Sequence, residues 1–247
     1  MSVKPYYEQD GIVIYHGDRR DVIAQLDCSQ VSLVIADPPY RSLDIDVIRG
    51  TTTRLVGQGS AAGRKPSKAN RLGAEDHWFE TIPDGELIED FTALYEAIPN
   101  DAAMYVFADV KSGLGIFPSL PQKNVIVWDK TTIGMGYSWR RMHEWIAYCP
   151  KEKHKLRSMA LGDIIRCHVP DKKRHPTEKP LGCLTPLIRN SSDAGDVVLD
   201  LFMGVGSTLV AAKLEGRRAI GIELCEAYAE IAANRLRQGV LFGSESA

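Results

Sequence analysis

The chain has 247 residues, of which 44% are apolar and 25% are charged, and its formal net charge is −2. This composition is typical of a soluble globular protein with one large α/β domain, and it disfavours a uniformly basic nucleic-acid-binding protein. No apolar run approaches the roughly 20 residues that span a bilayer, and MSVKPYYEQD at the start lacks the apolar core of a signal peptide. We therefore expect one cytoplasmic domain, residues 1–247.

Seven short apolar runs rich in β-forming residues predict strands at residues 12–15, 31–36, 103–108, 125–128, 145–148, 197–199 and 219–222. Between them, apolar residues recur at helical spacing, notably over residues 87–98 and 224–236. Strands that alternate with helices indicate an α/β fold with a doubly wound, mostly parallel, seven-stranded sheet.

The second predicted strand, VSLVIA, ends abruptly in the tetrapeptide Asp37, Pro38, Pro39, Tyr40. Asp-Pro is an ordinary turn starter, and proline cannot continue a sheet ladder, so a plain turn explains this stretch when it is considered alone. A short motif acquires meaning only in the right context. The rest of the chain must supply that context.

Two segments are strongly basic although the whole chain is slightly acidic. Residues 41–73 hold seven Lys/Arg against two Asp, and residues 139–174 hold ten Lys/Arg against four Asp/Glu. Residues 41–77 are also rich in Gly, Ser and Thr and lack apolar periodicity, as a functional loop would be. Such segments either contact a polyanion or are solvated loops.

The five cysteines contain no CxxC pair, and their odd number leaves at least one unpaired, so we expect reduced thiols. The candidate zinc ligands are Cys149, His154, Cys167, His168 and His175. Their spacing matches no standard zinc-binding frame. We expect no metal site.

The stretch RHPTEKPLGCLTPLI, residues 174–188, predicts a helix that begins near Thr177. Thr177 can cap the first turn and Pro180 is acceptable within it. Pro186 should kink or split this helix, because proline removes a backbone donor and its ring clashes with the preceding turn.

Near the C-terminus, VVLDLFMGVGST predicts a strand, a turn with Gly204 and Gly206, and a helix from about Ser207. A further strand follows and ends at Glu223. Glycines let a backbone approach a ligand, and a carboxylate after the next strand can accept hydrogen bonds from a ribose diol. Leu209 occupies the third glycine position of the dinucleotide fingerprint, so the pattern favours a nucleoside cofactor over a pyrophosphate.

Together the stretches DPPY, HPTEKP and DLFMGVGST closely resemble the DNA amino-methyltransferases, specifically the circularly permuted beta class. Further family-like stretches are IYHGD, VIVWDK and WRRMHEWIAYCPK, so the resemblance covers nearly the whole chain. It implies a Rossmann-like methyltransferase fold with S-adenosyl-L-methionine as cofactor, of the kind found in restriction–modification systems. In that fold the VVLD and VSLVIAD strands are neighbours.

The resemblance also implies a role for individual residues. The catalytic residues would be Asp37, Pro38, Pro39 and Tyr40, with the carboxylate of Asp37 and the carbonyl of Pro38 accepting the two N–H groups of an amino base, and Tyr40 stacking on the flipped base. The cofactor-binding residues would be Asp18, Asp37, Thr177, Lys179, Asp200, Phe202, Gly204, Gly206, Ser207 and Glu223. Asp18 can equally be a plain helix cap before RRDVIAQL.

The partner implied is double-stranded DNA, with a homodimer as a further expectation. The candidate DNA contacts are Arg41, Arg64, Lys65, Lys68, Trp139, Arg140 and Arg141, with a short target-recognition region at about residues 139–174. Asp37 favours adenine-N6 over cytosine-N4 as the target, since the cytosine enzymes of this family more often have Ser before Pro-Pro. An RNA methyltransferase and a catalytically silent nucleic-acid-binding regulator are weaker alternatives.

Overall fold

The structure is a computed structural model that describes residues 3–39, 82–134, 139–169 and 178–238. Several residues singled out above lie outside these ranges: Tyr40, Arg41, Arg64, Lys65, Lys68, His175 and Thr177, together with the whole basic loop at 41–77.

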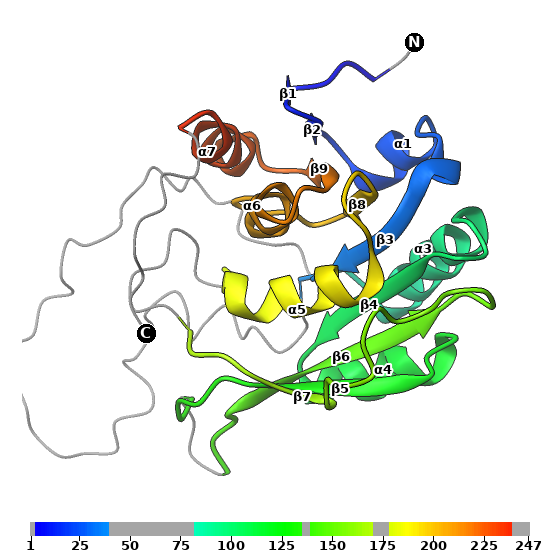
Figure 1. Ribbon diagram of the computed structural model, residues 1–247, viewed down its shortest axis with the longest axis vertical. Helices are drawn as coiled ribbons and strands as arrows, with labels where there is room; N and C mark the ends of the chain where they lie inside the picture. The colour runs from blue at the N-terminus through cyan, green and yellow to red at the C-terminus, as the bar shows by residue number, and fades with distance from the viewer. Residues whose placement is uncertain (1–2, 40–81, 135–138, 170–177, 239–247) are drawn as a thin grey trace, which may run out of the picture.

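A single sheet of nine strands forms the centre of the molecule, in the order β1-β2-β9-β8-β3-β4-β6-β5-β7 (Figure 1). The strands are β1 (Tyr7–Gln9), β2 (Ile12–His16), β3 (Val31–Ala36), β4 (Ala103–Ala108), β5 (Asn124–Asp129), β6 (His143–Pro150), β7 (Ile164–Arg166), β8 (Val197–Asp200) and β9 (Arg218–Glu223). All seven predicted strands are present, and β3 and β8 are neighbours as expected.

The number seven was wrong, because two edge strands were missed. Both β1 and β7 have only three residues, too few for a periodic apolar pattern to emerge. The first had a local signal nonetheless: β1 pairs antiparallel with β2 through Asp10 and Gly11, which have φ of 53° and 76°. Asp-Gly with positive φ at both positions is a preferred two-residue hairpin turn.

The sheet is mixed as well as mostly parallel. Five strand pairs are parallel, whereas β6 runs antiparallel to both β4 and β5 and β1 runs antiparallel to β2. The strand β6 returns from β5 through the connection at residues 130–142, part of which is described. This connection leaves the sheet from the edge at which β3, β4 and β5 end, because Asp129 pairs with His143 and Ala108 with Trp145.

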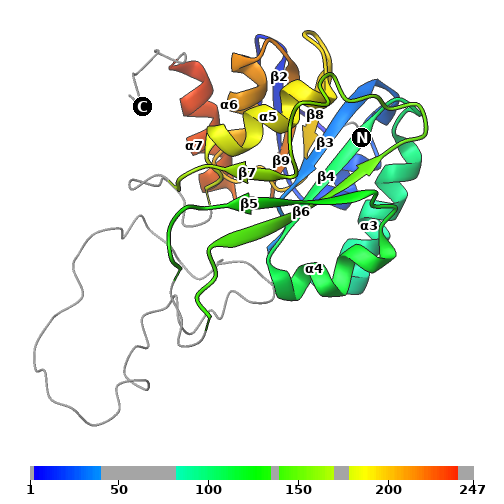
Figure 2. The ribbon, with the colours of Figure 1, turned by 60° about the horizontal axis from the view of Figure 1, so that its bottom comes forward.

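Helices cover both faces of the sheet. Figures 1 and 2 show α3 (Asp84–Ala97) and α4 (Val110–Ile116) on one face and α5 (Leu181–Ser191), α6 (Ser207–Leu214) and α7 (Glu226–Arg237) on the other. The short α1 (Arg19–Ile23) joins β2 to β3 by way of the 3₁₀ turn η1 (Cys28–Gln30), and a second 3₁₀ turn, η3 (Phe117–Ser119), follows α4. Every residue of the central strand β4 is buried between these layers.

Two expectations for α5 were wrong, its start near Thr177 and a split at Pro186, whereas a kink at Pro186 stays a prediction. The helix begins at Leu181 with Pro180 at its N-cap position, so the helix starts after Thr177 and not at it. Pro186 lies inside one unbroken helix of 11 residues. It is the sixth residue of the helix, and the proline costs α5 a single backbone bond, which buried packing of Leu184, Leu187 and Ile188 offsets.

The order of connections places a reversal of winding between β3 and β8. From β3 the chain continues to β4 on one side, and from β8 it continues to β9 on the other. Ligands of open α/β sheets bind at the carboxyl ends of strands at such a reversal, where two loops diverge. Asp37 follows β3 and the glycine turn follows β8, so both predicted halves of the site lie at this point.

Candidate active site

Four adjacent strands each end in an ionisable side chain at the reversal point: His16 on β2, Glu223 on β9, Asp200 on β8 and Asp37 after β3. The strand registers place them side by side, because His16 pairs with Glu223 and Asp200 pairs with both Gly221 and Ile35. Three carboxylates therefore meet along one edge of the sheet.

The glycine turn after β8 has the backbone shape that the sequence predicted. Gly204 has φ of 52°, and a Cβ added there would meet no atom within 4 Å. Gly206 has φ of 78° and lies against the Ala232 side chain of α7, 2.9 Å from a built Cβ. The turn is thus packed behind Gly206 and has open space at Gly204, as a cradle for a ligand requires.

Glu223 holds this turn in place. Its two carboxylate oxygens accept the backbone N–H of Gly204 at 2.9 Å and of Cys225 at 2.8 Å. Burial raises the pKa of Glu223, while these hydrogen bonds lower it in part. The side chain predicted to bind a ribose is therefore already ordered at the turn.

Asp200 is only 3% exposed and accepts the backbone N–H of Phe202 at 2.9 Å. Burial first, and the neighbouring charges of Asp37 and Glu223 after it, raise the pKa of Asp200 to about 7 against the hydrogen bonds that the carboxyl group accepts. This carboxyl group titrates near neutral pH because water cannot solvate its charge.

Phe202 is fixed from the other side of the turn. Its ring lies edge-on to Phe91 of α3 at 6.4 Å, and the guanidinium of Arg19 lies 5.5 Å from its centroid. Arg19 is itself buried and pairs with Glu86 and Asp90 of α3 at 2.6 Å. Its neighbour Asp18 is the N-cap of α1 and accepts the Arg20 N–H at 2.8 Å, which is the capping role considered above.

The HPTEKP segment joins the two halves of the site. Glu178 lies 3.2 Å from Arg235 of α7 and 3.4 Å from the hydroxyl of Ser207, and Arg235 also donates to the Val205 carbonyl at 2.6 Å. The next residue, Lys179, donates to Oδ2 of Asp37. One side chain of the segment thus contacts the glycine turn and the next contacts the predicted catalytic carboxylate.

Lys179 is buried in spite of its charge, with 7% of its side chain exposed. Its ammonium lies 3.3 Å from Oε2 of Glu144 and over the rings of Phe107 and Trp128. Burial lowers the pKa of Lys179, but the carboxylates of Asp37 and Glu144 outweigh it and hold that pKa above its ordinary value.

Sequence reasoning missed Glu144 and Lys130. Lys130, just after β5, donates to Oε1 of Glu144 at 2.5 Å, and burial raises the pKa of Glu144 less than the two lysines lower it. Both residues stand in family-like stretches, but each is one ordinary charge beside an apolar strand. No local signal in the sequence predicts that the two meet, because it is the antiparallel pairing of β5 with β6 that brings Lys130 to Glu144.

The predicted proline corner and DNA contacts are partly described. Pro38 is buried and Pro39 half-buried directly after β3. Trp139 is 98% exposed and Arg140 is exposed, both in the connection between β5 and β6, whereas Arg141 donates to Asp109 at 2.7 Å. Of the predicted recognition region, residues 143–150 and 164–166 are strands of the sheet.

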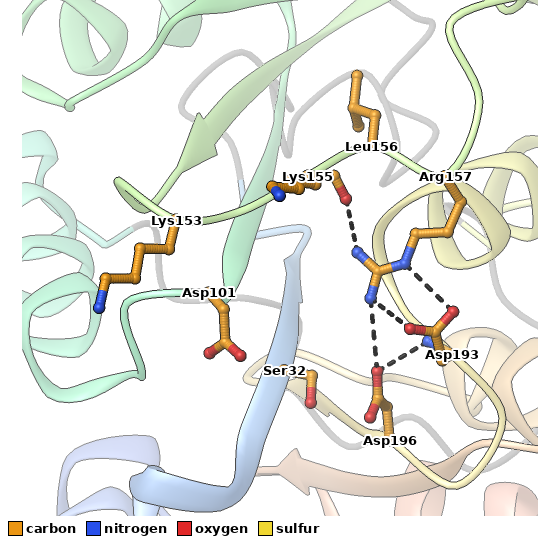
Figure 3. A pocket seen from close by; sticks show the side chains of 8 residues that line it. All are labelled: Ser32, Asp101, Lys153, Lys155, Leu156, Arg157, Asp193 and Asp196. Carbon is orange, nitrogen blue, oxygen red and sulfur yellow. Dashed lines mark hydrogen bonds and ion pairs between the residues drawn. The ribbon is translucent and has the colours of Figure 1, made fainter.

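The opposite edge of the sheet has a hollow of about 370 Å³ that contains none of the predicted site residues (Figure 3). It is lined at the amino ends of β3, β4 and β8 by Ser32, Asp101, Lys153, Lys155, Leu156, Arg157, Asp193 and Asp196.

All five cysteines are free thiols, and within the described residues no three His, Cys, Asp or Glu side chains gather as metal ligands would. No helix in the described ranges is long and apolar enough to cross a membrane.

Comparison with known proteins identifies the family. The family model described as DNA methylase matches residues 160–234, from before β7 into α7. The chain is 32% identical to the Type II methyltransferase M.HinfI of Haemophilus influenzae, over 91% of this chain and 68% of that protein. It is 30% identical to the Type II methyltransferase M.HhaII of Haemophilus parahaemolyticus, over 78% of this chain and 82% of that protein. The chain belongs to the DNA methylase family.

The fold of this DNA methylase agrees with that assignment. The crystal structure of the M1.HpyAVI-SAM complex superposes with a TM-score of 0.61 at 22% identity, over 90% of this chain and 98% of that one. The part of this DNA methylase that the family model matches supplies the glycine turn, Asp200 and Glu223. Asp37 and its lysine partner Lys179 come from two different parts of the chain, one before and one within that segment.

Proposed function

We propose that this DNA methylase transfers a methyl group from S-adenosyl-L-methionine to the exocyclic N6 of adenine in duplex DNA. The observation that carries the proposal is the position of Asp37. Its carboxylate follows β3 at the reversal of winding, beside the glycine turn, and is held by the ammonium of the buried Lys179.

The residues of the glycine turn fit this cofactor. The open space at Gly204 gives room for a ligand against backbone, and the ordered carboxylate of Glu223 lies where a ribose diol needs an acceptor. Gly206, Ser207 and Phe202 shape the same turn, and Asp18 lies one loop away at the end of β2. Thr177 and Lys179 would stand at the methionine end, with Thr177 outside the described residues.

The bound cofactor supplies an electrophilic methyl group on sulfur. The chain must then make the amino group of the base nucleophilic, because its lone pair is delocalised into the ring. Asp37 and the carbonyl of Pro38 accept the two N–H groups and direct the lone pair toward the methyl group. As the N–C bond forms the S–C bond breaks, and Asp37 is placed to accept the proton that the amino nitrogen then loses.

DNA would approach the carboxyl edge of the sheet. A base must leave the duplex to reach Asp37, and Tyr40 supplies a ring on which it can stack. The exposed Trp139 and Arg140 lie in a connection that leaves the same edge, so they are candidate DNA contacts. Arg141 contributes indirectly at most in this arrangement, since Asp109 engages it. The basic loop at 41–77, with Arg41, Arg64, Lys65 and Lys68, is a further candidate.

Adenine-N6 is favoured over cytosine-N4 by the acidic residue before Pro-Pro, Asp37. Assignment to the beta class is supported by the order of parts in the chain, with the tetrapeptide before the glycine turn. The recognition region at about 139–174 and a homodimer stay predictions.

The proposal is tested by methyl transfer from isotopically labelled S-adenosylmethionine to mixed-sequence duplex DNA, with mass spectrometry of the digested nucleosides. We expect label in N6-methyladenine for the parent chain and none for Asp37→Ala. Label in N4-methylcytosine would retain the mechanism and correct the base. Label in RNA alone, or no label although the cofactor binds, would contradict the proposal and support the RNA or regulatory alternatives.

A further inference from the structure

Lys179 is shared between two carboxylates that come from different strands. Asp37 follows β3 and Glu144 is the second residue of β6, and β4 lies between these strands. The Lys179 ammonium spans that distance above Phe107 of β4, at 5.2 Å from the ring centroid. The exposed fractions of the three side chains are 19% for Asp37, 7% for Lys179 and 14% for Glu144.

The sharing changes the electrostatics at Asp37. If the buried lysine paired with Asp37 alone, its positive charge would cancel most of the negative potential of the Asp37 carboxylate. The cancellation would be large because charges inside a protein are poorly screened. Glu144 adds a second negative charge 3.3 Å from the ammonium, on the side away from Asp37's strand. Lys130, which follows β5 on the far side of β6 from β3, in turn compensates Glu144 at 2.5 Å. The charges alternate outward from Asp37.

This alternation suits the reaction proposed above. The amino nitrogen of the base gains positive charge as the methyl group arrives, so a cation beside Asp37 opposes transfer unless a second anion offsets it. We propose that Glu144 is a positioning residue for methyl transfer: it draws the charge of Lys179 away from Asp37, so that Asp37 keeps its negative field toward the target amino group. This inference rests on the proposed function.

The groups that face Lys179 determine the pH dependence expected. They are the carboxylates of Asp37 and Glu144 and the thiol of Cys183 in the first turn of α5. Burial raises the pKa of the Cys183 thiol, so it stays neutral. Burial lowers the pKa of Lys179, and the charges of Asp37 and Glu144 raise it. If the Glu144 charge is removed, only Asp37 still raises it, so the pKa of Lys179 falls.

The test compares Glu144→Gln with Glu215→Gln in the full chain. Glu215 is a matched control, because its side chain is 13% exposed and it accepts from Arg189 at 2.6 and 2.9 Å, away from the site. Four quantities are measured for each variant: the melting temperature, the affinity for S-adenosylhomocysteine by calorimetry, and the single-turnover rate and its pH profile on mixed-sequence duplex DNA.

We expect the rate of Glu144→Gln to fall about tenfold or more, with product affinity within about twofold of the parent. Its rate should also recover in part as the pH rises into the alkaline range, because Lys179 then loses the proton whose charge opposes transfer, and the parent should show no such rise. Glu215→Gln should keep the parent rate and profile. If the two variants lose stability and rate alike at every pH while the parent is active, Glu144 is merely structural and the inference is overturned. A parent chain that binds the cofactor product but methylates no DNA instead overturns the proposed function.

Discussion

The two edges of the central sheet are built from the same kinds of residue but differ in what the fold does to them. At the amino edge, Arg157 pairs with Asp193 at 2.7 Å around an open hollow, and the exposed fractions of the two side chains are 33% and 68%. At the carboxyl edge, the buried Lys179 pairs with Asp37 and Glu144, whose side chains are only 19% and 14% exposed. Water therefore screens the first pair much more than the second.

This difference teaches that the hollow is the less informative feature of the surface. The amino-edge hollow holds ion pairs whose charges solvent already stabilises, so they carry little energy for binding or chemistry. The carboxyl edge holds charges that the fold keeps away from water, which is how proteins shift pKa values toward functional use. The reversal of winding also lies there, where loops diverge.

The largest difference between the edges should appear in catalysis. We expect Asp37→Asn to reduce the single-turnover rate of methyl transfer by about 10²–10⁴-fold, since an amide accepts hydrogen bonds poorly and cannot take a proton. Asp193→Asn is the matched change at the amino edge, because Asp193 likewise accepts from one basic side chain, that of Arg157. This variant should keep the single-turnover rate within about twofold of the parent. Comparable losses in the two variants would show that the carboxyl edge has no special role.

The next largest difference concerns stability. Lys179→Met leaves two half-buried carboxylates without their shared, buried cation, and we expect a loss of about 3–5 kcal/mol in the free energy of unfolding. At about 2–4 °C per kcal/mol for a chain of this size, the melting temperature at pH 8 should fall by roughly 10 °C. Arg157→Met should cost about 0–1 kcal/mol. Equal shifts in melting temperature would contradict the contrast in burial.

The pH dependence of stability should have opposite signs at the two edges. The pKa of Asp200 is about 7 in the native state against an ordinary 3.8, so the unfolded chain alone loses this proton between about pH 4 and 7, and stability falls as pH rises through that window. Asp200→Asn removes this loss, so its stability relative to the parent should rise by up to about 4 kcal/mol between pH 4 and 7.

At the amino edge the Arg157 guanidinium lowers the pKa of Asp193, so its contribution is present above the ordinary value and is lost as the pH falls below it. Relative to the parent, Asp193→Asn should therefore change stability only in acid. Urea unfolding at a series of pH values measures both differences, and a flat difference between parent and Asp200→Asn would contradict the raised pKa.

The smallest expected effect is on the affinity for the cofactor product, and it compares Gly204, in the predicted ligand site, with Gly195, in an ordinary turn. Gly204 and Gly195 have φ of 52° and 86°, and neither has an atom within 4 Å of a built Cβ. Replacement by Ala should cost each variant about 1–2 kcal/mol of backbone strain. Only Gly204→Ala should weaken S-adenosylhomocysteine binding, by about tenfold in calorimetry. Similar affinities in the two variants would place the cofactor elsewhere.

The sequence by itself determined the parts that depend on local pattern. Apolar runs long enough to show periodicity gave all seven strands that were predicted, and the tetrapeptide at Asp37 and the glycine turn at Gly204 were recognisable from their residues. Strands of three residues escaped this reasoning, because three positions cannot show a period. The start of α5 and the continuity of its helix through Pro186 also escaped it, since packing outweighed a local preference.

Only the tertiary structure decided which charges meet. Residues that are 142 positions apart in sequence cannot be paired from composition, yet Lys179 reaches Asp37 because β3 and β8 are neighbours and α5 begins beside them. Glu144 joins them because β6 turns back between β4 and β5. The physical reason is that an ion pair gains functional strength from burial, and burial is a property of the whole packed sheet.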